Sequence, residues 1–334
     1  MRLDLSVVIP CYNCENTIVR CLDSIPKGIG IEIILVDDCS SDNTLKKISG
    51  YQKTHPDEAI RIVSNLKNLG AGETRNKALD MVTRKYLMFV DSDDQLAAGF
   101  AEQVEHEFDV GFDCLIFDAE MVSPSGSSVL KMFYANGIVR GNIPQKEALV
   151  YVRAATWSKI YRSQIIRDHD IRFGCIPRNE DLVFTKAALC FCSMVRYLDR
   201  PLYYYNDNPA SLMNDHSLLT EKNAMNAVSL VRPIITGSGF EPEFNSIYFL
   251  EIVYATTLTL LRMGRSSKEC RDHFKTVHAQ YRKKDPYRSR YMLKYRLSYL
   301  LYRLDLFVLF KLIFRYIYRR KIDAVRTERE PDVE

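Results

Sequence analysis

The sequence predicts an α/β fold in which a mostly parallel sheet is flanked by helices, followed by a C-terminal helical extension. The first 95 residues alternate short apolar runs with stretches of helical periodicity, a pattern typical of right-handed βαβ units. Three of the four apolar runs end in polar loops. Beyond residue 220 helical periodicity takes over, and a basic excess gathers near the C-terminus.

The composition is that of a globular protein with a substantial core. Of 334 residues, 47% are hydrophobic and 26% are charged, and the length suits one large or two modest domains. We expect a main domain over residues 1–215, with halves at 1–95 and 96–215, and a helical region over 216–334. The nine cysteines are scattered and Met1 leads directly into a strand, so we expect a reducing, cytoplasmic setting. Cys11 and Cys14 form a CxxC with no second pair to complete a zinc site, and we interpret the spacing as coincidence.

Local pattern predicts each element in order. The expected strands of the first half are residues 5–10, 31–36, 60–64 and 86–90, and the expected helices are residues 17–25, a helix beginning near 44, and 73–82. Asp42 can cap the second of these helices. Further along we expect a helix at 100–108, a strand at 113–122 with a hairpin partner at 129–134, and amphipathic helices at 218–235 and 247–263.

The strand at 86–90 is continuously apolar and ends on three carboxylates, those of Asp91, Asp93 and Asp94. An apolar run of this kind is typical of a central strand covered on both faces. Ligands of open α/β sheets bind at the carboxyl ends of the strands, and carboxylate oxygens suit Mg2+ or Mn2+. The alternative is a polar turn that caps the next helix.

The glycine pattern argues against two classes of nucleotide site. Gly70 and Gly72 begin a GxGxxG-like run, but its last position is Arg75, and the run follows the third strand instead of the first. No GxxxxGK[ST] occurs. NAD and P-loop chemistry are therefore disfavoured, and a metal-assisted nucleotide site remains, with Arg75 and Lys77 placed to meet phosphate.

Four motifs in this order resemble the signatures of family 2 glycosyltransferases. They are Val7 to Asn13, Ile34 to Asp42, Asn68 to Gly70 with Thr74 to Asn76, and Phe89 to Asp94. These enzymes are inverting sugar transferases with a Rossmann-like, A-type nucleotide-diphospho-sugar transferase fold. Each motif is weak by itself, but their order and spacing over residues 5–94 make the resemblance specific.

The resemblance implies a role for most polar residues of the first half. Asp38 would accept a hydrogen bond from the base, which is uracil if the donor is a UDP-sugar, while Asp37 would hold the structure or the ribose. Asp93 would be the direct Mn2+ or Mg2+ ligand of the DxD pair, with Asp91 on the ribose or a metal-bound water and Asp94 as a helix cap or supporting carboxylate. The full expected nucleotide-binding set is Pro10, Tyr12, Asn13, Asp37, Asp38, Asn68, Gly70, Arg75, Asp91 and Ser92.

Two later segments complete the expected site. Glu180 and Asp181 precede an apolar helix, where they could simply favour the positive end of its dipole. The family resemblance implies instead that this pair supplies the catalytic base, with Asp181 preferred over Glu180, while the metal and Arg75 stabilise the departing diphosphate. Trp157 and Lys159 lie in a segment that is either an acceptor or donor-sugar platform or an aromatic core anchor.

The last third carries a basic, aromatic-rich segment over residues 291–321. Lys311, Arg315 and Arg319 recur every four residues, so they align on one face of a helix. A helix of this kind suits the surface of an anionic membrane, and the segment falls short of a membrane span. We therefore expect peripheral attachment to the inner face of the cell membrane, with a helix packed on the protein itself as the alternative. No motif for nucleic-acid binding occurs.

The function expected from these observations is an inverting, metal-dependent transfer of a sugar from a nucleotide diphosphate donor, preferably a UDP-sugar, to a glycan hydroxyl. A lipid-linked acceptor in bacterial surface-polysaccharide or capsule synthesis would suit the C-terminal segment. Two alternatives stay open. A sugar-nucleotide nucleotidyltransferase needs a glycine-rich basic loop after the first strand, where this chain has Cys11 to Glu15. A non-catalytic partner that binds glycan or membrane would not need the carboxylates of Asp91, Asp93 and Asp181, which are all present in this chain.

Overall fold

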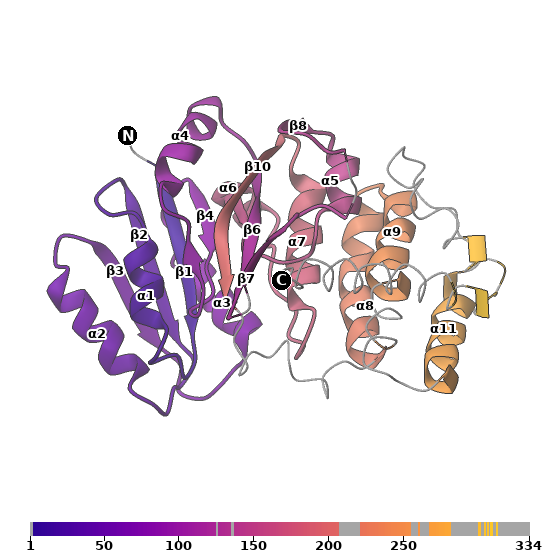
Figure 1. Cartoon of the computed structure of the whole chain (residues 1–334), viewed down its shortest axis with the longest axis horizontal. Helices are drawn as coiled ribbons and strands as arrows, with labels where there is room; N and C mark the ends of the chain where they lie inside the picture. The colour runs from indigo at the N-terminus through magenta and orange to yellow at the C-terminus, as the bar shows by residue number, and fades with distance from the viewer. Residues whose placement is uncertain are drawn as a thin grey trace, which may run out of the picture. The chain divides into compact units, whose positions relative to one another are not determined.

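In the computed structural model the chain divides into two compact units, Met1–Phe240 and Glu241–Glu334. The structure describes residues 3–124, 126–134, 137–206 and 221–254, and in the C-terminal part residues 260, 267–281, 300, 301, 304, 306, 308, 309 and 312. The first unit holds the sheet and the helices that cover it (Figure 1).

The sheet of the first unit is mixed. Its strand order is β3-β2-β1-β4-β9-β6-β10-β5, with β7 paired to β6 and β8 paired to β10. The strands are β1 (Leu5–Cys11), β2 (Ile31–Asp37), β3 (Ala59–Ser64), β4 (Tyr86–Phe89), β5 (Gln95–Leu96), β6 (Cys114–Ser123), β7 (Gly126–Leu130), β8 (Gly141–Ile143), β9 (Lys159–Arg162) and β10 (Val195–Asn206). The first four strands pair in parallel, whereas β9 runs antiparallel to both β4 and β6.

The helices of the first unit lie between these strands in the chain, except for α8, which follows β10. They are α1 (Ile18–Ser24), α2 (Thr44–Thr54), α3 (Ala71–Leu79), α4 (Phe100–Val110), α5 (Gln145–Tyr151), α6 (Ser163–Asp168), α7 (Glu180–Phe191) and α8 (Glu221–Gly237). Helix α3 packs on β1 and β2, so these strands are covered. Asp42 accepts the Thr44 backbone N–H at 2.9 Å, as a capping side chain would, although Asn43 occupies the N-cap position of α2 and makes no side-chain capping bond.

Burial explains why the central strands are so apolar. Every residue of β2 and β4 is buried, including Asp37 at the end of β2. The expected hairpin is also present, since β7 runs antiparallel to β6, although its strand begins earlier than the expected residues 129–134. The buried strands form the core, and polar residues follow at their carboxyl ends.

The strand order creates a switch point between β1 and β4. The chain steps outward from β1 to β2 to β3 and then returns to the other side of β1 with β4. At such a switch point the loops that follow neighbouring strands commonly diverge, and open α/β sheets bind their ligands there. The expected nucleotide and metal residues lie at the carboxyl ends of β1 and β2 or after β1, β2, β3 and β4, so they gather at this edge.

Helix α8 belongs to the first unit because it packs against α7. The boundary between the units follows Phe240, and the expected boundary at 215/216 lies outside the described residues. In the second unit, α9 (Glu241–Ile247) continues into a π-helix at Tyr248–Tyr254, and α11 spans Ser267–Tyr281. Apart from single residues between 300 and 312, the basic segment 291–321 lies outside the described residues. Within the part of the chain that the structure describes, no helix is both long and apolar enough to span a membrane.

Candidate active site

The carboxyl ends of β1, β2 and β4 bring the expected motifs together. Cys11 is the register partner of Asp37, and the Asp38 backbone N–H donates to the Cys11 carbonyl at 2.7 Å. On the other side of β1, the Val90 N–H donates to the Val8 carbonyl at 3.0 Å, one residue before Asp91. Loops distant in sequence therefore start side by side.

The loop after β1 presents an exposed aromatic ring. Tyr12 is 51% exposed, and Pro10 before it is half-buried. Asn13 has a positive φ of 47°, and its side-chain carbonyl accepts the Ser41 backbone N–H at 2.9 Å. That bond ties the β1 loop to the β2 loop and leaves the Tyr12 ring at the rim, where it can stack on a flat ligand.

Asp38 is buried and holds the loop after β3. Its Oδ1 accepts the Asn65 side-chain amide and the Leu69 backbone N–H, each at 2.8 Å. Its Oδ2 accepts the Gly70 N–H, also at 2.8 Å, and Asn68 Oδ1 receives the same N–H at 3.1 Å. Gly70 adopts a φ of 84°, which a side chain would strain. The structure thus engages both Asp38 oxygens in fixing this loop.

Asp37 differs from Asp38 in having one carboxylate oxygen unused. Asp37 is 2% exposed, and its Oδ2 accepts the Ser40 backbone N–H at 3.3 Å. Its Oδ1 is buried and has no hydrogen bond among the described residues. A buried acceptor without a donor is costly, so Asp37 has capacity for a further hydrogen bond at this edge.

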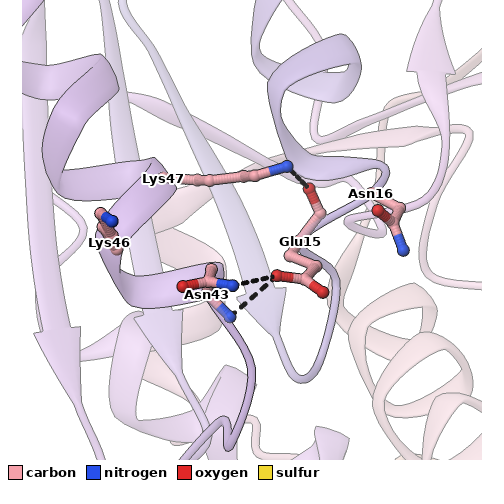
Figure 2. Close-up of a pocket in the computed structure, with 5 residues that line it drawn as sticks. All are labelled: Glu15, Asn16, Asn43, Lys46 and Lys47. Carbon is pink, nitrogen blue, oxygen red and sulfur yellow. Dashed lines mark hydrogen bonds between the residues drawn. The ribbon is translucent and has the colours of Figure 1, made fainter.

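A hollow of about 500 Å3 lies beside the β1 loop and is shown in Figure 2. Its lining residues are Glu15, Asn16, Asn43, Lys46 and Lys47. The Glu15 carboxylate accepts the backbone and side-chain N–H groups of Asn43, and Lys47 donates to the Glu15 carbonyl at 2.6 Å. Neither the acidic loop after β4 nor the pair at the start of α7 lines this hollow, so it is separate from the candidate site.

The acidic loop after β4 exposes two carboxylates and buries the third. Asp91, Ser92 and Asp93 are partly exposed, whereas Asp94 is 1% exposed. Asp91 Oδ1 accepts an Arg75 N–H at 2.8 Å. Burial raises the pKa of Asp94 to about 8, helped by the charges of Asp91 and Asp93, while donors from β10 oppose the shift.

Arg75 joins this loop to the start of α7. Its side chain is 6% exposed, and its guanidinium contacts Asp91 at 2.8 Å, Glu180 at 3.2 Å and Asp181 at 3.4 Å. Burial would lower the pKa of Arg75, but the three carboxylates outweigh it and raise that pKa. Arg75 was expected to meet phosphate, and in this structure its N–H groups face carboxylates instead, while Lys77 donates to Asn65 and to the Ser64 carbonyl.

The Glu180–Asp181 pair stands at the first turn of α7, where Asn179 has a positive φ of 66°. Asp181 accepts the Thr156 backbone N–H at 3.4 Å and the Thr156 hydroxyl at 3.3 Å. Burial raises the pKa of Asp181 to about 7, with Arg75 opposing and Glu180 adding to the shift. A carboxylate with this pKa is suited to accept a proton near neutral pH.

Trp157 and Lys159 lie inside the protein. Trp157 is 8% exposed and stacks on Tyr203 and Tyr205 with ring centroids 4.9 and 5.3 Å apart. Lys159 is fully buried and its ammonium donates to the Ala155 carbonyl. Neither side chain presents a face to a sugar in this structure, and the geometry matches the alternative of an aromatic core anchor.

The donor set at the acidic loop fits a divalent cation that shares its ligands with a substrate. Within the described ranges, no group of three or more His, Cys, Asp or Glu side chains is arranged to hold a metal ion. Asp93 and the second oxygen of Asp91 provide two hard ligands, and Mg2+ or Mn2+ commonly takes one or two carboxylates plus diphosphate oxygens and water. The buried Asp94 supports the loop from behind.

Sequence reasoning missed the contribution of β10 to this site. The Tyr203 hydroxyl and the Asn206 backbone N–H both bind Asp94, more than 100 positions earlier in the chain. The sequence hint of this contribution was the run of three tyrosines at 203–205. A buried tyrosine hydroxyl usually finds a hydrogen-bond partner, so one member of such a run could be expected to bind a polar group.

Comparisons with known proteins agree with this geometry. Residues 6–132 match the family model described as Glycosyl transferase family 2. The chain is 30% identical over 215 residues to the poly(ribitol-phosphate) beta-N-acetylglucosaminyltransferase TarS of Staphylococcus aureus, covering 61% of this chain and 35% of that protein. It is 26% identical over 216 residues to the poly(ribitol-phosphate) beta-glucosyltransferase of Bacillus spizizenii, covering 61% and 32%. The match thus spans about a third of the length of these relatives.

Solved structures confirm the predicted fold class. Residues 1–349 of S. aureus TarS in complex with UDP superpose with a TM-score of 0.66 at 21% identity, covering 96% of this chain and 92% of that one. The mannosyltransferase PcManGT from Pyrobaculum calidifontis, in complex with GDP-Man and Mn2+, gives a TM-score of 0.51 at 15% identity, covering 93% and 87%. At these identities the likeness concerns the fold.

Proposed function

We propose that the chain, which matches the family 2 glycosyltransferase model over residues 6–132 and is 30% identical to TarS over 215 residues, is a member of that family. It would transfer a sugar with inversion from a UDP-sugar to a glycan hydroxyl, with a divalent metal at the acidic loop. The observation that carries the proposal is the cluster around Arg75, which joins Asp91 of the acidic loop to Glu180 and Asp181 at the start of α7. A donor seated at the β1–β4 switch point would have its reacting carbon beside a carboxylate with a pKa of about 7.

The donor nucleotide is assigned to the rim of β1 and β2. Tyr12 would stack on the base, and Pro10 and Asn13 shape the same loop. The unused oxygen of Asp37 would accept a donor from the base or ribose, while Asp38 holds the backbone of Leu69 and Gly70 in place. Asp93, with Asp91 and Ser92 beside it, would hold Mn2+ or Mg2+, which when bound neutralises charge on the diphosphate.

Asp181 is assigned the role of general base. It would take the proton of the acceptor hydroxyl as the acceptor oxygen forms its bond to the anomeric carbon and the bond from that carbon to the diphosphate oxygen breaks. UDP leaves with the electron pair of the broken bond, and attack from the opposite side inverts the configuration. Thr156 and Arg75 fix the orientation of Asp181, and Glu180 shares the charge of Arg75.

The acceptor is proposed to be a bacterial surface polysaccharide or its lipid-linked precursor. The names of both relatives reported above include poly(ribitol-phosphate), which supports a polymeric acceptor for this chain too. The basic segment 291–321 would bind the anionic inner face of the cell membrane and bring the site to such an acceptor.

Titration of the purified chain with UDP, GDP and CDP tests the donor site. Calorimetry with Mn2+ and with EDTA should give binding of UDP only when the metal is present, and Asp93→Asn should abolish that dependence. Asp57→Asn, at an exposed carboxylate away from the loop, is the control. Preference for GDP or CDP would change the donor, and no binding of any nucleotide would favour a non-catalytic protein.

A further inference from the structure

The last residues of β10 hold the acidic loop from behind. Tyr203 is fully buried, and its hydroxyl donates to Asp94 Oδ2 at 2.7 Å while it accepts the Asp91 backbone N–H at 3.1 Å. One hydroxyl thus contacts both ends of the loop. A phenyl ring could make neither bond.

Asn206 adds two further bonds from the same strand. Its backbone N–H donates to Asp94 Oδ1 at 2.8 Å, and its side-chain amide donates to the Asp93 carbonyl at 2.9 Å. The Arg20 guanidinium reaches the same carbonyl at 3.0 Å. Every one of these bonds uses the backbone of the loop or the buried Asp94, and none of them uses the carboxylate of Asp91 or Asp93.

The Tyr203 ring is itself fixed by the segment that orients the base. Trp157 stacks on it with an interplanar angle of 14°, and the preceding residue, Thr156, donates to Asp181. On the strand, Tyr203 is the register partner of Leu96 in β5, directly beyond the acidic loop. The acidic loop and the proposed base, Asp181, are therefore supported by the same group of packed residues.

We propose that Tyr203 is a positioning residue for the donor: its hydroxyl sets the Asp91–Asp94 loop in the conformation that binds metal and UDP. This role rests on the proposed function, because metal and UDP are the ligands of the loop. It goes beyond that function by assigning donor affinity to a hydroxyl that touches neither metal nor nucleotide. Fixing the loop before the ligand arrives removes an ordering cost from binding.

The same strand offers a matched control. The Tyr197 hydroxyl donates to Asp118 Oδ2 at 2.8 Å, so β10 carries two bonds from a tyrosine to a buried aspartate. Tyr203→Phe and Tyr197→Phe each remove one such bond, but only the first touches the acidic loop. If Tyr203 only stabilised the fold, the two variants should show equal changes in UDP affinity.

Calorimetric titration of wild type, Tyr203→Phe and Tyr197→Phe with UDP and Mn2+ tests the role, with Tm measured on each. We expect Tyr203→Phe to lose roughly 10- to 100-fold in UDP affinity, as supporting residues of metal sites do, and Tyr197→Phe to stay within about twofold of wild type. Fluorescence of Trp157, the only tryptophan, should keep its emission maximum in both variants because the stacked ring remains.

The outcomes separate this role from the function itself. Wild-type affinity in Tyr203→Phe, or an equal loss in both variants, would overturn the positioning role while the donor site stood. A wild-type chain that binds no UDP with Mn2+ would overturn the proposed function and this role together.

Discussion

Asp38 and Asp181 are carboxylates at the same edge of the sheet, but the protein neutralises them differently. Asp38 accepts three neutral donors, two of them backbone N–H groups. Asp181 shares the single charge of Arg75 with Asp91 and Glu180. The donors to Asp38 carry no net charge that could be shared with another group, so the Asp38 cluster is a fixed support. Three carboxylates around one guanidinium keep a net negative charge. A metal ion, a proton or a cationic transition state can still compensate that charge.

If this contrast is correct, the largest effect comes from removing the base. Asp181→Asn should lower the rate of transfer from a UDP-sugar by about 10²- to 10⁴-fold, because the amide cannot accept the acceptor proton. UDP affinity with Mn2+ should change little, since Asp181 acts on the acceptor. Single-turnover transfer and calorimetry on the same preparation measure the two quantities. Near wild-type transfer would remove Asp181 from the mechanism, and a loss found in Glu180→Gln instead would move the base to Glu180.

Removing the shared cation should have the next largest effect. Arg75→Met leaves three carboxylates around an apolar side chain, and breaking a buried ion pair costs about 3–5 kcal/mol of unfolding free energy. The lower end of that range is expected, because the partners are 18–26% exposed. Urea denaturation measures it. The control is Arg172→Met, whose pairs with Asp80 and Asp170 are at the surface and worth about 0–1 kcal/mol. Equal losses in the two variants would contradict the central place of Arg75.

A substitution in the Asp38 cluster should lower the free energy of unfolding by a smaller amount. Asp38→Asn turns one acceptor oxygen into an N–H2 group that faces a backbone N–H, which costs about 1–3 kcal/mol of unfolding free energy. The loss should barely depend on salt, because the partners of Asp38 are neutral. Denaturation at low and high salt measures it, beside Arg75→Met, whose loss should depend on salt more strongly. A strong salt dependence for Asp38→Asn would show that charge matters in this cluster too.

The sequence was sufficient for the parts of the site that depend on local pattern. Apolar strands with acidic ends predicted β2 and β4, and the bond from the Thr44 backbone N–H to Asp42 followed from their spacing. Parallel strands then bring their ends to one edge without any further information. The resemblance over residues 5–94 predicted a likeness to family 2 glycosyltransferases, and residues 6–132 match the model of that family.

What sequence reasoning could not predict are contacts made across long stretches of chain. Arg75 stands 105 positions before Glu180, and the position of Arg75 in a GxGxxG-like run suggested phosphate as its partner. Trp157 is buried only because β10 returns to stack two tyrosines on it. Tertiary packing decides whether an aromatic or basic side chain faces a ligand or the core, and local pattern carries no signal for that choice.

The smallest of the expected effects is the pH dependence of the transfer rate that Asp181 should set. Burial raises the pKa of Asp181 to about 7, so the base is lost as pH falls through 7, and the transfer rate should fall about tenfold between pH 8 and pH 6. An aspartate of ordinary pKa, about 3.9, would keep its activity down to pH 5. Transfer rates at saturating donor, with UDP affinity measured at each pH as the control, locate the acid limb. A midpoint below pH 5 would mean that Arg75 outweighs burial at Asp181, and Asp181 would then not be tuned to accept a proton near neutral pH.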